Sequence, residues 1–158
     1  MIVFHGSTIA IPCPDTKHSH KFMDLGSGFY VATQKSQAVR WCQKFMRSDQ
    51  AGMISTYELD TARAAADFSI KIFETYSEEW LNFILNCRDD TDCSSFDIVQ
   101  GNILSDPIFN IIELYINELV SKEETLHQLQ SKPANTQICF RNQNAIASCL
   151  KYKGSEKL

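Results

Sequence analysis

The sequence has no long apolar run. A helix needs roughly 20 consecutive apolar residues to cross a bilayer, and no segment of the 158 residues approaches that length. The opening stretch, MIVFHGSTIAIPCP, has neither a basic start nor a continuous apolar core, so it differs from a secretory signal. We therefore expect a cytoplasmic protein with no membrane partner.

Positive charge is also scarce. The 15 basic residues are outnumbered by 19 acidic ones, giving a net charge of −4, and no long basic run occurs. Proteins that hold nucleic acid by electrostatics are usually basic, so the composition argues against a non-specific DNA or RNA binder. A nucleic acid held briefly as a substrate remains compatible with it. Hydrophobic residues at 44% and charged residues at 22% are typical of a globular chain of one domain.

Closely spaced cysteine pairs are missing as well. The chain has no C-x-x-C spacing and is long enough to bury a core without cross-links, so we expect free, mostly buried thiols. Cys13, His18 and His20 lack a fourth ligand and match no zinc module, and we predict no metal site. A nucleophilic Cys139 paired with His5 has no supporting signature but is left open. The six cysteines are Cys13, Cys42, Cys87, Cys93, Cys139 and Cys149.

What is present is a mixture of short strands and helices in irregular order. Because the order lacks regular strand–helix–strand alternation, we predict an α+β fold rather than a doubly wound one. One domain is expected over residues 1–153, followed by a frayed tail at 154–158. Apolar periodicity predicts strands over 1–5, 28–33, 53–59, 69–73, 96–99 and 137–140, and helices over 36–46, from 77, from 106, over 121–130 and over 144–150.

Two short motifs allow more than one interpretation. Gly26-Ser27-Gly28 lacks the third glycine of a dinucleotide fingerprint and the lysine of a P-loop, and it precedes a strand. We interpret it as a bend that leads the chain into that strand. His5-Gly6-Ser7 ends the first strand and is either a plain turn or a histidine facing a cleft. In the second case Gly6 would expose a backbone N–H and C=O, which can bind a primary amide.

The motifs taken in order resemble the ADP-ribosyltransferase superfamily. More narrowly, they resemble the branch with a His–Tyr–Glu triad, which includes the poly(ADP-ribose) polymerase and diphtheria-toxin-like catalytic domains. The likeness is greatest to a family of small bacterial proteins of uncharacterised function within that branch. The motifs that carry it are HGS at 5–7, GSGFY at 26–30, QAVRW at 37–41, SEEWLNF at 77–83, FDIVQG at 96–101 and QICF at 137–140.

This resemblance implies a split, mostly antiparallel β-sheet core around an NAD cleft, with peripheral helices. It assigns the catalytic triad to His5, Tyr30 and Gln137. His5 would hydrogen-bond the adenosine ribose, the backbone of Gly6 would hold the nicotinamide amide, and Tyr30 would stack on the nicotinamide ring. Trp41 would close the other side of that ring. The NAD-binding residues implied are His5, Gly6, Ser7, Gly28, Tyr30 and Trp41.

One departure from the family pattern bears on activity. Gln137 stands where a glutamate is usual, so hydrogen bonding is kept while a countercharge for the cationic transition state is lost. The expected function is mono-ADP-ribosyl transfer from NAD to an unknown protein or nucleic-acid acceptor, as a toxin or defence effector with a cognate inhibitor protein. Asp106 is a candidate for activating the acceptor. The alternative is a weak or inactive module that binds NAD, ADP-ribose or a partner protein.

Overall fold

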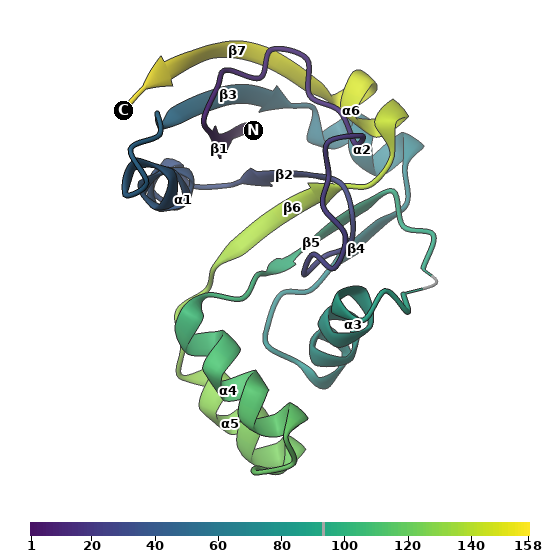
Figure 1. Ribbon diagram of the computed structural model, residues 1–158. Helices are drawn as coiled ribbons and strands as arrows, with labels where there is room; N and C mark the ends of the chain where they lie inside the picture. The colour runs from purple at the N-terminus through teal and green to yellow at the C-terminus, as the bar shows by residue number, and fades with distance from the viewer. Residues whose placement is uncertain (93) are drawn as a thin grey trace.

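The structure is a computed structural model that describes residues 1–92 and 94–158 (Figure 1). Its described residues form a seven-stranded mixed sheet and six helices, which confirms the predicted α+β class. The strand order across the sheet is β4-β5-β6-β2-β1-β3-β7. The strands are β1 (Ile2–Ser7), β2 (Phe29–Ala32), β3 (Met53–Leu59), β4 (Ile70–Ile72), β5 (Ile98–Asn102), β6 (Thr136–Phe140) and β7 (Leu150–Lys157); the helices are α1 (Lys35–Met46), α2 (Thr61–Asp67), α3 (Glu78–Arg88), α4 (Asp106–Ile116), α5 (Lys122–Gln130) and α6 (Gln143–Cys149).

The centre of the sheet contains a weak joint between β1 and β2. β1 pairs with β3 along its whole length, from Ile2 to Ser7, and β2 pairs with β6 from Phe29 to Ala32. Between β1 and β2, the described residues show one aligned pair, Phe4 with Ala32. Neighbouring strands run antiparallel except for β4 and β5, which are parallel. The sheet therefore consists of two well-paired halves that meet at a short contact.

The core lies on both faces of the sheet because side chains alternate along each strand. Phe29 and Val31 of β2 join a cluster with Tyr57 and other residues of β1, β3 and β6. Tyr30, which lies between them, packs against the opposite cluster, which includes the fully buried Trp80. Burying one large apolar side chain is worth about 1.5–3 kcal/mol, so both clusters contribute substantially to holding β2 in place.

Local capping signals place the helices as the sequence predicts. Ser77 accepts a hydrogen bond from the backbone N–H of Trp80, at 3.1 Å, and begins α3. Ser121 does the same for Glu124 at the start of α5. Proline follows Asp106 in the first turn of α4, where its missing N–H costs no hydrogen bond. These contacts are local, which is why the sequence reveals them.

The predicted frayed tail at 154–158 is wrong as far as Lys157. Residues 150–157 form β7, an edge strand that runs antiparallel to β3, with Lys157 opposite Met53. Ser155 and Ser55 add a side-chain hydrogen bond of 2.9 Å. Lysines on an exposed edge strand discourage pairing with other chains, and the same lysines made this strand resemble a polar tail in the sequence. Helix α2 is a second element that the sequence did not predict.

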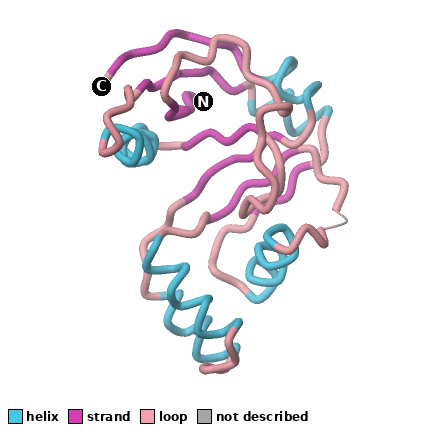
Figure 2. The backbone as a smooth tube through the Cα atoms, viewed as in Figure 1, coloured by secondary structure: helices cyan, strands magenta, loops and turns pink. Residues whose placement is uncertain are grey.

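The loop between β1 and β2, residues 8–28, crosses one face of the sheet (Figure 2). The N–H of Ile11 donates to the Ser55 hydroxyl at 3.0 Å, and the hydroxyl of Tyr57 donates to the carbonyl of Ile11. Further along, the N–H of Gly28 donates to the Ser19 hydroxyl at 2.6 Å. The loop is therefore pinned to β3 near its start and closed on itself near its end.

The cysteines behave as expected where the structure describes them. Cys42, Cys87, Cys139 and Cys149 are buried free thiols, and Cys13 is free and exposed. Cys93 lies outside the described residues.

In the described part of the chain, no helix combines the length and apolarity needed to cross a membrane.

Candidate functional site

His5 is bound to the neighbouring half of the sheet through its ring. Its Nδ1 lies 2.7 Å from the carbonyl oxygen of Tyr30, and its ring stacks on Phe29 with the centroids 4.5 Å apart. A carbonyl oxygen can only accept, so Nδ1 must carry the proton and donate it. The neutral ring is then the tautomer whose Nε2 has a free lone pair. His5 thus spans the joint where β1 and β2 are barely paired.

The environment of His5 favours this neutral form. Burial lowers the pKa of the ring below its usual value of 6.5, against a smaller opposing effect of the hydrogen bond to Tyr30. Nε2 has no hydrogen-bond partner among the described residues. Every fully buried polar side-chain atom of those residues does have a partner. Nε2 is therefore not fully buried, and His5 offers a hydrogen-bond acceptor to an incoming hydroxyl or amine.

The hydroxyl of Tyr30 is fixed by two hydrogen bonds. Its hydroxyl donates to the carbonyl of Gly26 at 2.6 Å and accepts from the N–H of Leu25 at 3.0 Å. Burial raises the pKa of the hydroxyl well above its usual value of 10, so this group stays protonated. The ring itself is half-buried. Tyr30 therefore offers a rigid aromatic surface rather than an acid or base.

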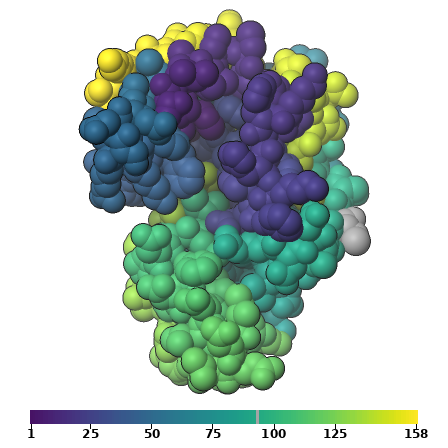
Figure 3. Space-filling view, viewed as in Figure 1, coloured from purple at the N-terminus to yellow at the C-terminus, as the bar shows by residue number. Residues whose placement is uncertain are grey.

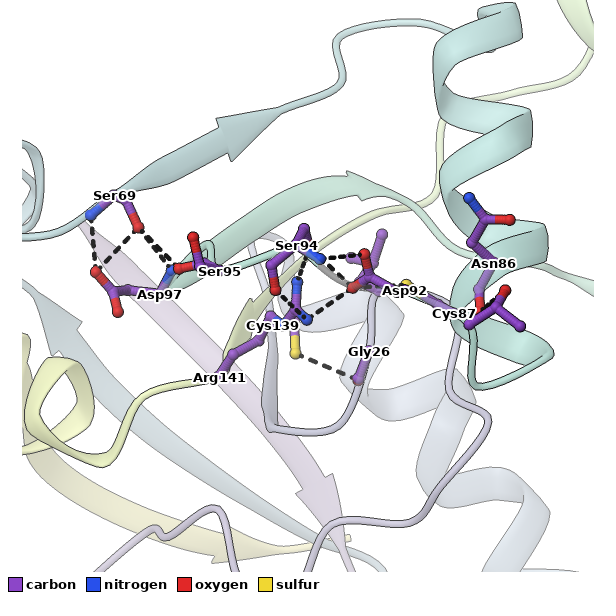
Figure 4. Close-up of polar contacts among 12 residues, drawn as sticks. Gly26, Ser69, Asn86, Cys87, Asp92, Ser94, Ser95, Asp97, Cys139 and Arg141 are labelled. Atoms are coloured by element: carbon purple, nitrogen blue, oxygen red, sulfur yellow. Dashed lines mark hydrogen bonds and ion pairs between the residues drawn. The ribbon is translucent and has the colours of Figure 1, made fainter.

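The two glycines before Tyr30 are required by shape, as the sequence interpretation held. Gly26 has a φ of +89°, which favours glycine, and a Cβ there would lie 3.1 Å from Nε of Arg141. A Cβ at Gly28 would lie 2.4 Å from the carbonyl oxygen of Phe140. The Gly26 carbonyl also accepts from the thiol of Cys139, with Sγ and O 3.6 Å apart (Figure 4). The glycines let the chain turn tightly and enter β2 against β6.

Gln137 lies beside Tyr30 on the same face of the sheet. It pairs with Ala32 across β2 and β6, while Tyr30 pairs with Cys139 two residues further along. Opposite residues of antiparallel strands share a face, and diagonal neighbours lie about 7–8 Å apart. Within the described part of the chain, the Gln137 amide has no side-chain hydrogen-bond partner. The structure thus brings Tyr30 and Gln137 together on one face. The side chain of His5 lies on the opposite face, where it stacks on Phe29, and it reaches Tyr30 only through the backbone carbonyl.

The sequence did not reveal the residues that hold the start of β6. Gln37 is 7% exposed, and its Nε2 donates to the Thr136 carbonyl at 3.2 Å and to Asn135 at 3.3 Å. Asn102, 2% exposed, accepts from the N–H of Asn135 at 2.8 Å. These amides position the residue before Gln137. The capping box that Gln37 forms with Gln34 could have been recognised, but contacts across 33 or 99 positions could not.

The other predicted NAD-binding residues lie on or near β1 and α1. Gly6 is buried against α1, because a Cβ there would lie 2.6 Å from the carbonyl oxygen of Ala38. The hydroxyl of Ser7 donates to the carbonyl of Ile9 at 2.6 Å. Trp41 is 39% exposed on α1, and its ring contacts Lys44 and Phe45 of the same helix. Among the described residues, no ring contact joins Trp41 to Tyr30.

The remaining candidates are Cys139, the group of Cys13, His18 and His20, and Asp106. The thiol of Cys139 faces Gly26, and burial raises its pKa to about 12, which does not suit a nucleophile paired with His5. His18 pairs with Asp15 on the surface. The described residues contain no group of three or more His, Cys, Asp or Glu side chains able to hold a metal. Asp106 is exposed at the first turn of α4.

A cavity of about 240 Å³ lies at the opposite end of β6 from Gln137. Arg141 lines it, donating to Asp92 at 2.7 Å and to the Ser94 hydroxyl at 2.8 Å (Figure 4). Both charged partners are largely buried, at 17% and 12% exposure. This ion pair ties the end of β6 to the segment after α3. The ion pair also holds the Arg141 side chain beside Gly26.

Comparison with known proteins identifies the family of this chain. The chain matches the family described as protein of unknown function (DUF3990) over residues 1–152. No curated protein and no solved structure matches it. Because the family match spans nearly the whole chain, the protein belongs to the DUF3990 family.

Proposed function

We propose that this protein binds NAD⁺ at the joint between β1 and β2 and transfers a single ADP-ribose unit to an acceptor. The observation that carries the proposal is the bond between His5 Nδ1 and the Tyr30 carbonyl. It leaves Nε2 as an acceptor without a partner among the described residues, which suits a ribose hydroxyl. The ordered motifs of the sequence supply the resemblance to ADP-ribosyltransferases, and this arrangement supports the proposal.

The edge of β1 supports the same proposal. Among the described residues, Phe4 and Ala32 are the one aligned pair of β1 and β2, so the strand pairing does not use the backbone groups of β1 that face β2 beyond Phe4. A primary amide such as nicotinamide needs one N–H and one C=O side by side, and Gly6 can supply them. The surface is also hollowed where α1, the loop of residues 8–28 and the α4–α5 region meet (Figure 3).

Gln137 would act on the ribose as it becomes cationic. In the proposed step the bond between nicotinamide and ribose breaks, its electron pair leaves with nicotinamide, and the ribose becomes an oxocarbenium-like cation that the acceptor attacks. The Gln137 amide oxygen would accept a hydrogen bond from the ribose 2′-hydroxyl. An amide lacks the negative charge of a glutamate, and loss of one such electrostatic contribution typically costs about 2.7–4 kcal/mol. The proposed enzyme is therefore slow.

The second candidate function is a module that binds NAD⁺ or ADP-ribose without turning it over. The neutral Gln137 favours it, because the remaining site keeps its binding groups and lacks a countercharge. Both candidates predict NAD⁺ binding. They differ in the release of nicotinamide.

The test is to incubate the protein with NAD⁺ carrying a labelled adenosine, together with a cell lysate, and to measure both released nicotinamide and labelled macromolecules. Transfer predicts both products, and both should disappear in a His5→Ala variant that remains folded. A thermal-shift titration runs alongside, since ligand at about 100 times its dissociation constant stabilises by about 2.7 kcal/mol. Stabilisation without product supports the binding module. Neither stabilisation nor product contradicts both candidates.

A further inference from the structure

Helix α1 concentrates positive charge in an otherwise acidic protein. The chain has a net charge of −4. From Lys35 to Arg47, however, four basic residues occur and no acidic one. Lys35 pairs with Glu156 of β7. The remaining three, Arg40, Lys44 and Arg47, are exposed and define a surface that we call the α1 basic stripe.

The arginines of this stripe differ from the others in lacking an acidic partner. Among the described residues, the side chains of Arg40 and Arg47 form no ion pair and no hydrogen bond, although the chain contains abundant carboxylates. An exposed guanidinium without a partner is free to bind phosphate oxygens in its planar, bidentate geometry. The other three arginines of the sequence are all paired, as Arg63–Asp67, Arg88–Asp24 and Arg141–Asp92.

The spacing of the stripe places its charges in one line. Positions i, i+4 and i+7 of a helix share a face, and with a rise of about 1.5 Å per residue the line is about 10 Å long. In Figure 3, the blue segment that contains α1 stands out on the surface beside the hollow. A linear array of cations on a protruding helix is complementary to a chain of phosphates.

An aromatic ring lies directly beside this stripe. Trp41 is 39% exposed, and the ammonium of Lys44 lies 4.6 Å from its ring centroid. Aromatic side chains next to a basic track are how proteins hold single-stranded nucleic acid without sequence preference, because every base can stack on them. Trp80, the other tryptophan, is fully buried.

From these observations we infer that the exposed face of α1 is a binding surface for single-stranded nucleic acid, with phosphates on Arg40, Lys44 and Arg47 and a base on Trp41. A membrane surface fits less well, because Ala38 and Cys42 on the apolar face of α1 are buried against the sheet and cannot insert into lipid. An acidic peptide would use the cations but not the stacking surface. The inference goes beyond the proposed function, since such binding requires no NAD⁺.

The experiment measures binding of a fluorescein-labelled, mixed-sequence single-stranded DNA of about 12 nucleotides by fluorescence anisotropy, without NAD⁺, from about 50 to 200 mM salt. Three phosphate contacts predict a slope of about −2 for log affinity against log salt concentration. The double substitution Arg40→Gln with Arg47→Gln should reduce that slope to about −0.7. The matched control, Arg63→Gln with Lys122→Gln, removes two paired surface cations and should leave binding unchanged.

Stacking is tested separately through tryptophan fluorescence. Because Trp80 is fully buried, quenching by added DNA reports on Trp41, and polyaspartate of equal charge should neither quench it nor bind as tightly. The inference is overturned if the DNA does not bind at the lowest salt concentration, or if the stripe variant, folded by circular dichroism, binds like the control. Equal binding and equal quenching with polyaspartate would also overturn it, in favour of an acidic peptide.

Discussion

The ring of His5 in β1 donates a hydrogen bond from Nδ1 to the carbonyl oxygen of Tyr30 in β2, across 2.7 Å. This bond joins the two halves of the sheet where strand pairing is otherwise confined, among the described residues, to Phe4 and Ala32. One contact therefore fixes the tautomer of the histidine and the position of the strand that carries the tyrosine. Structure and proposed chemistry depend on the same atom pair.

The first prediction concerns pH. Burial lowers the pKa of His5 below its usual 6.5, so the unfolded chain takes up a proton at a pH where the folded chain does not. The stabilising contribution of neutral His5 is thus complete above about pH 6.5 and is lost as pH falls from there toward the folded-state pKa. Urea unfolding between about pH 7.5 and 5.5 should show a steeper loss of stability for the wild type than for His5→Gln. Equal slopes would contradict a half-buried ring that stays neutral in the folded protein.

The second prediction separates the hydroxyl of Tyr30 from its ring. Tyr30→Phe removes the donor to Gly26 and the acceptor for Leu25, which should lower the free energy of unfolding by about 1–3 kcal/mol. The ring remains, so NAD⁺ affinity in a calorimetric titration should change little. Tyr115→Phe is the control, because the described residues give its hydroxyl no hydrogen bond. Equal stability of the two variants would show that the Tyr30 hydroxyl does not anchor the loop.

The third prediction concerns the close approach of β2 to β6. Gly28→Ala would place a Cβ 2.4 Å from the backbone oxygen of Phe140, which cannot move without disturbing β6. We expect a loss of about 1–3 kcal/mol in denaturant unfolding. Gly101→Ala is the matched control, since its Cβ would meet the Phe73 side chain at 3.3 Å, and a side chain can adjust. If Gly101→Ala is the more damaging substitution, the packing argument fails.

The fourth prediction restores the charge that the site lacks. Gln137→Glu places a carboxylate on the face that carries Tyr30, and the added electrostatic stabilisation should speed release of nicotinamide by about a hundredfold to a thousandfold. Gln137→Ala should bind NAD⁺ and release less nicotinamide than the wild type. The rates are compared by chromatography of nicotinamide at saturating NAD⁺. A Gln137→Glu variant that binds NAD⁺ but is no faster than the wild type would contradict the role assigned to this position.

The sequence predicted the elements whose signals are local. The strand at residues 53–59 matches β3 at both ends, and the caps at Ser77 and Ser121 lie where the pattern placed them. β7 was missed because its partner β3 lies about a hundred residues away, as in the Ser55–Ser155 pair. No local pattern specifies such a pairing, and alternating lysines are equally typical of a polar tail.

The contacts that support the candidate site could not be predicted from the sequence. His5, Tyr30 and Gln137 follow from a resemblance, whereas the bond from His5 ends on a backbone carbonyl 25 positions away. The amides of Gln37 and Asn102 that fix the start of β6 come from two distant segments, α1 and β5. Such contacts depend on the folded topology, so only the structure reveals them.

A crystal structure of the protein with NAD⁺ tests the central claim most directly. We predict the nicotinamide ring on Tyr30, its amide paired with the backbone of Gly6, and a ribose hydroxyl donating to Nε2 of His5, with Gln137 at the other ribose. NAD⁺ bound elsewhere on the protein, or crystals grown at saturating NAD⁺ that show this joint filled by side chains alone, would contradict the account.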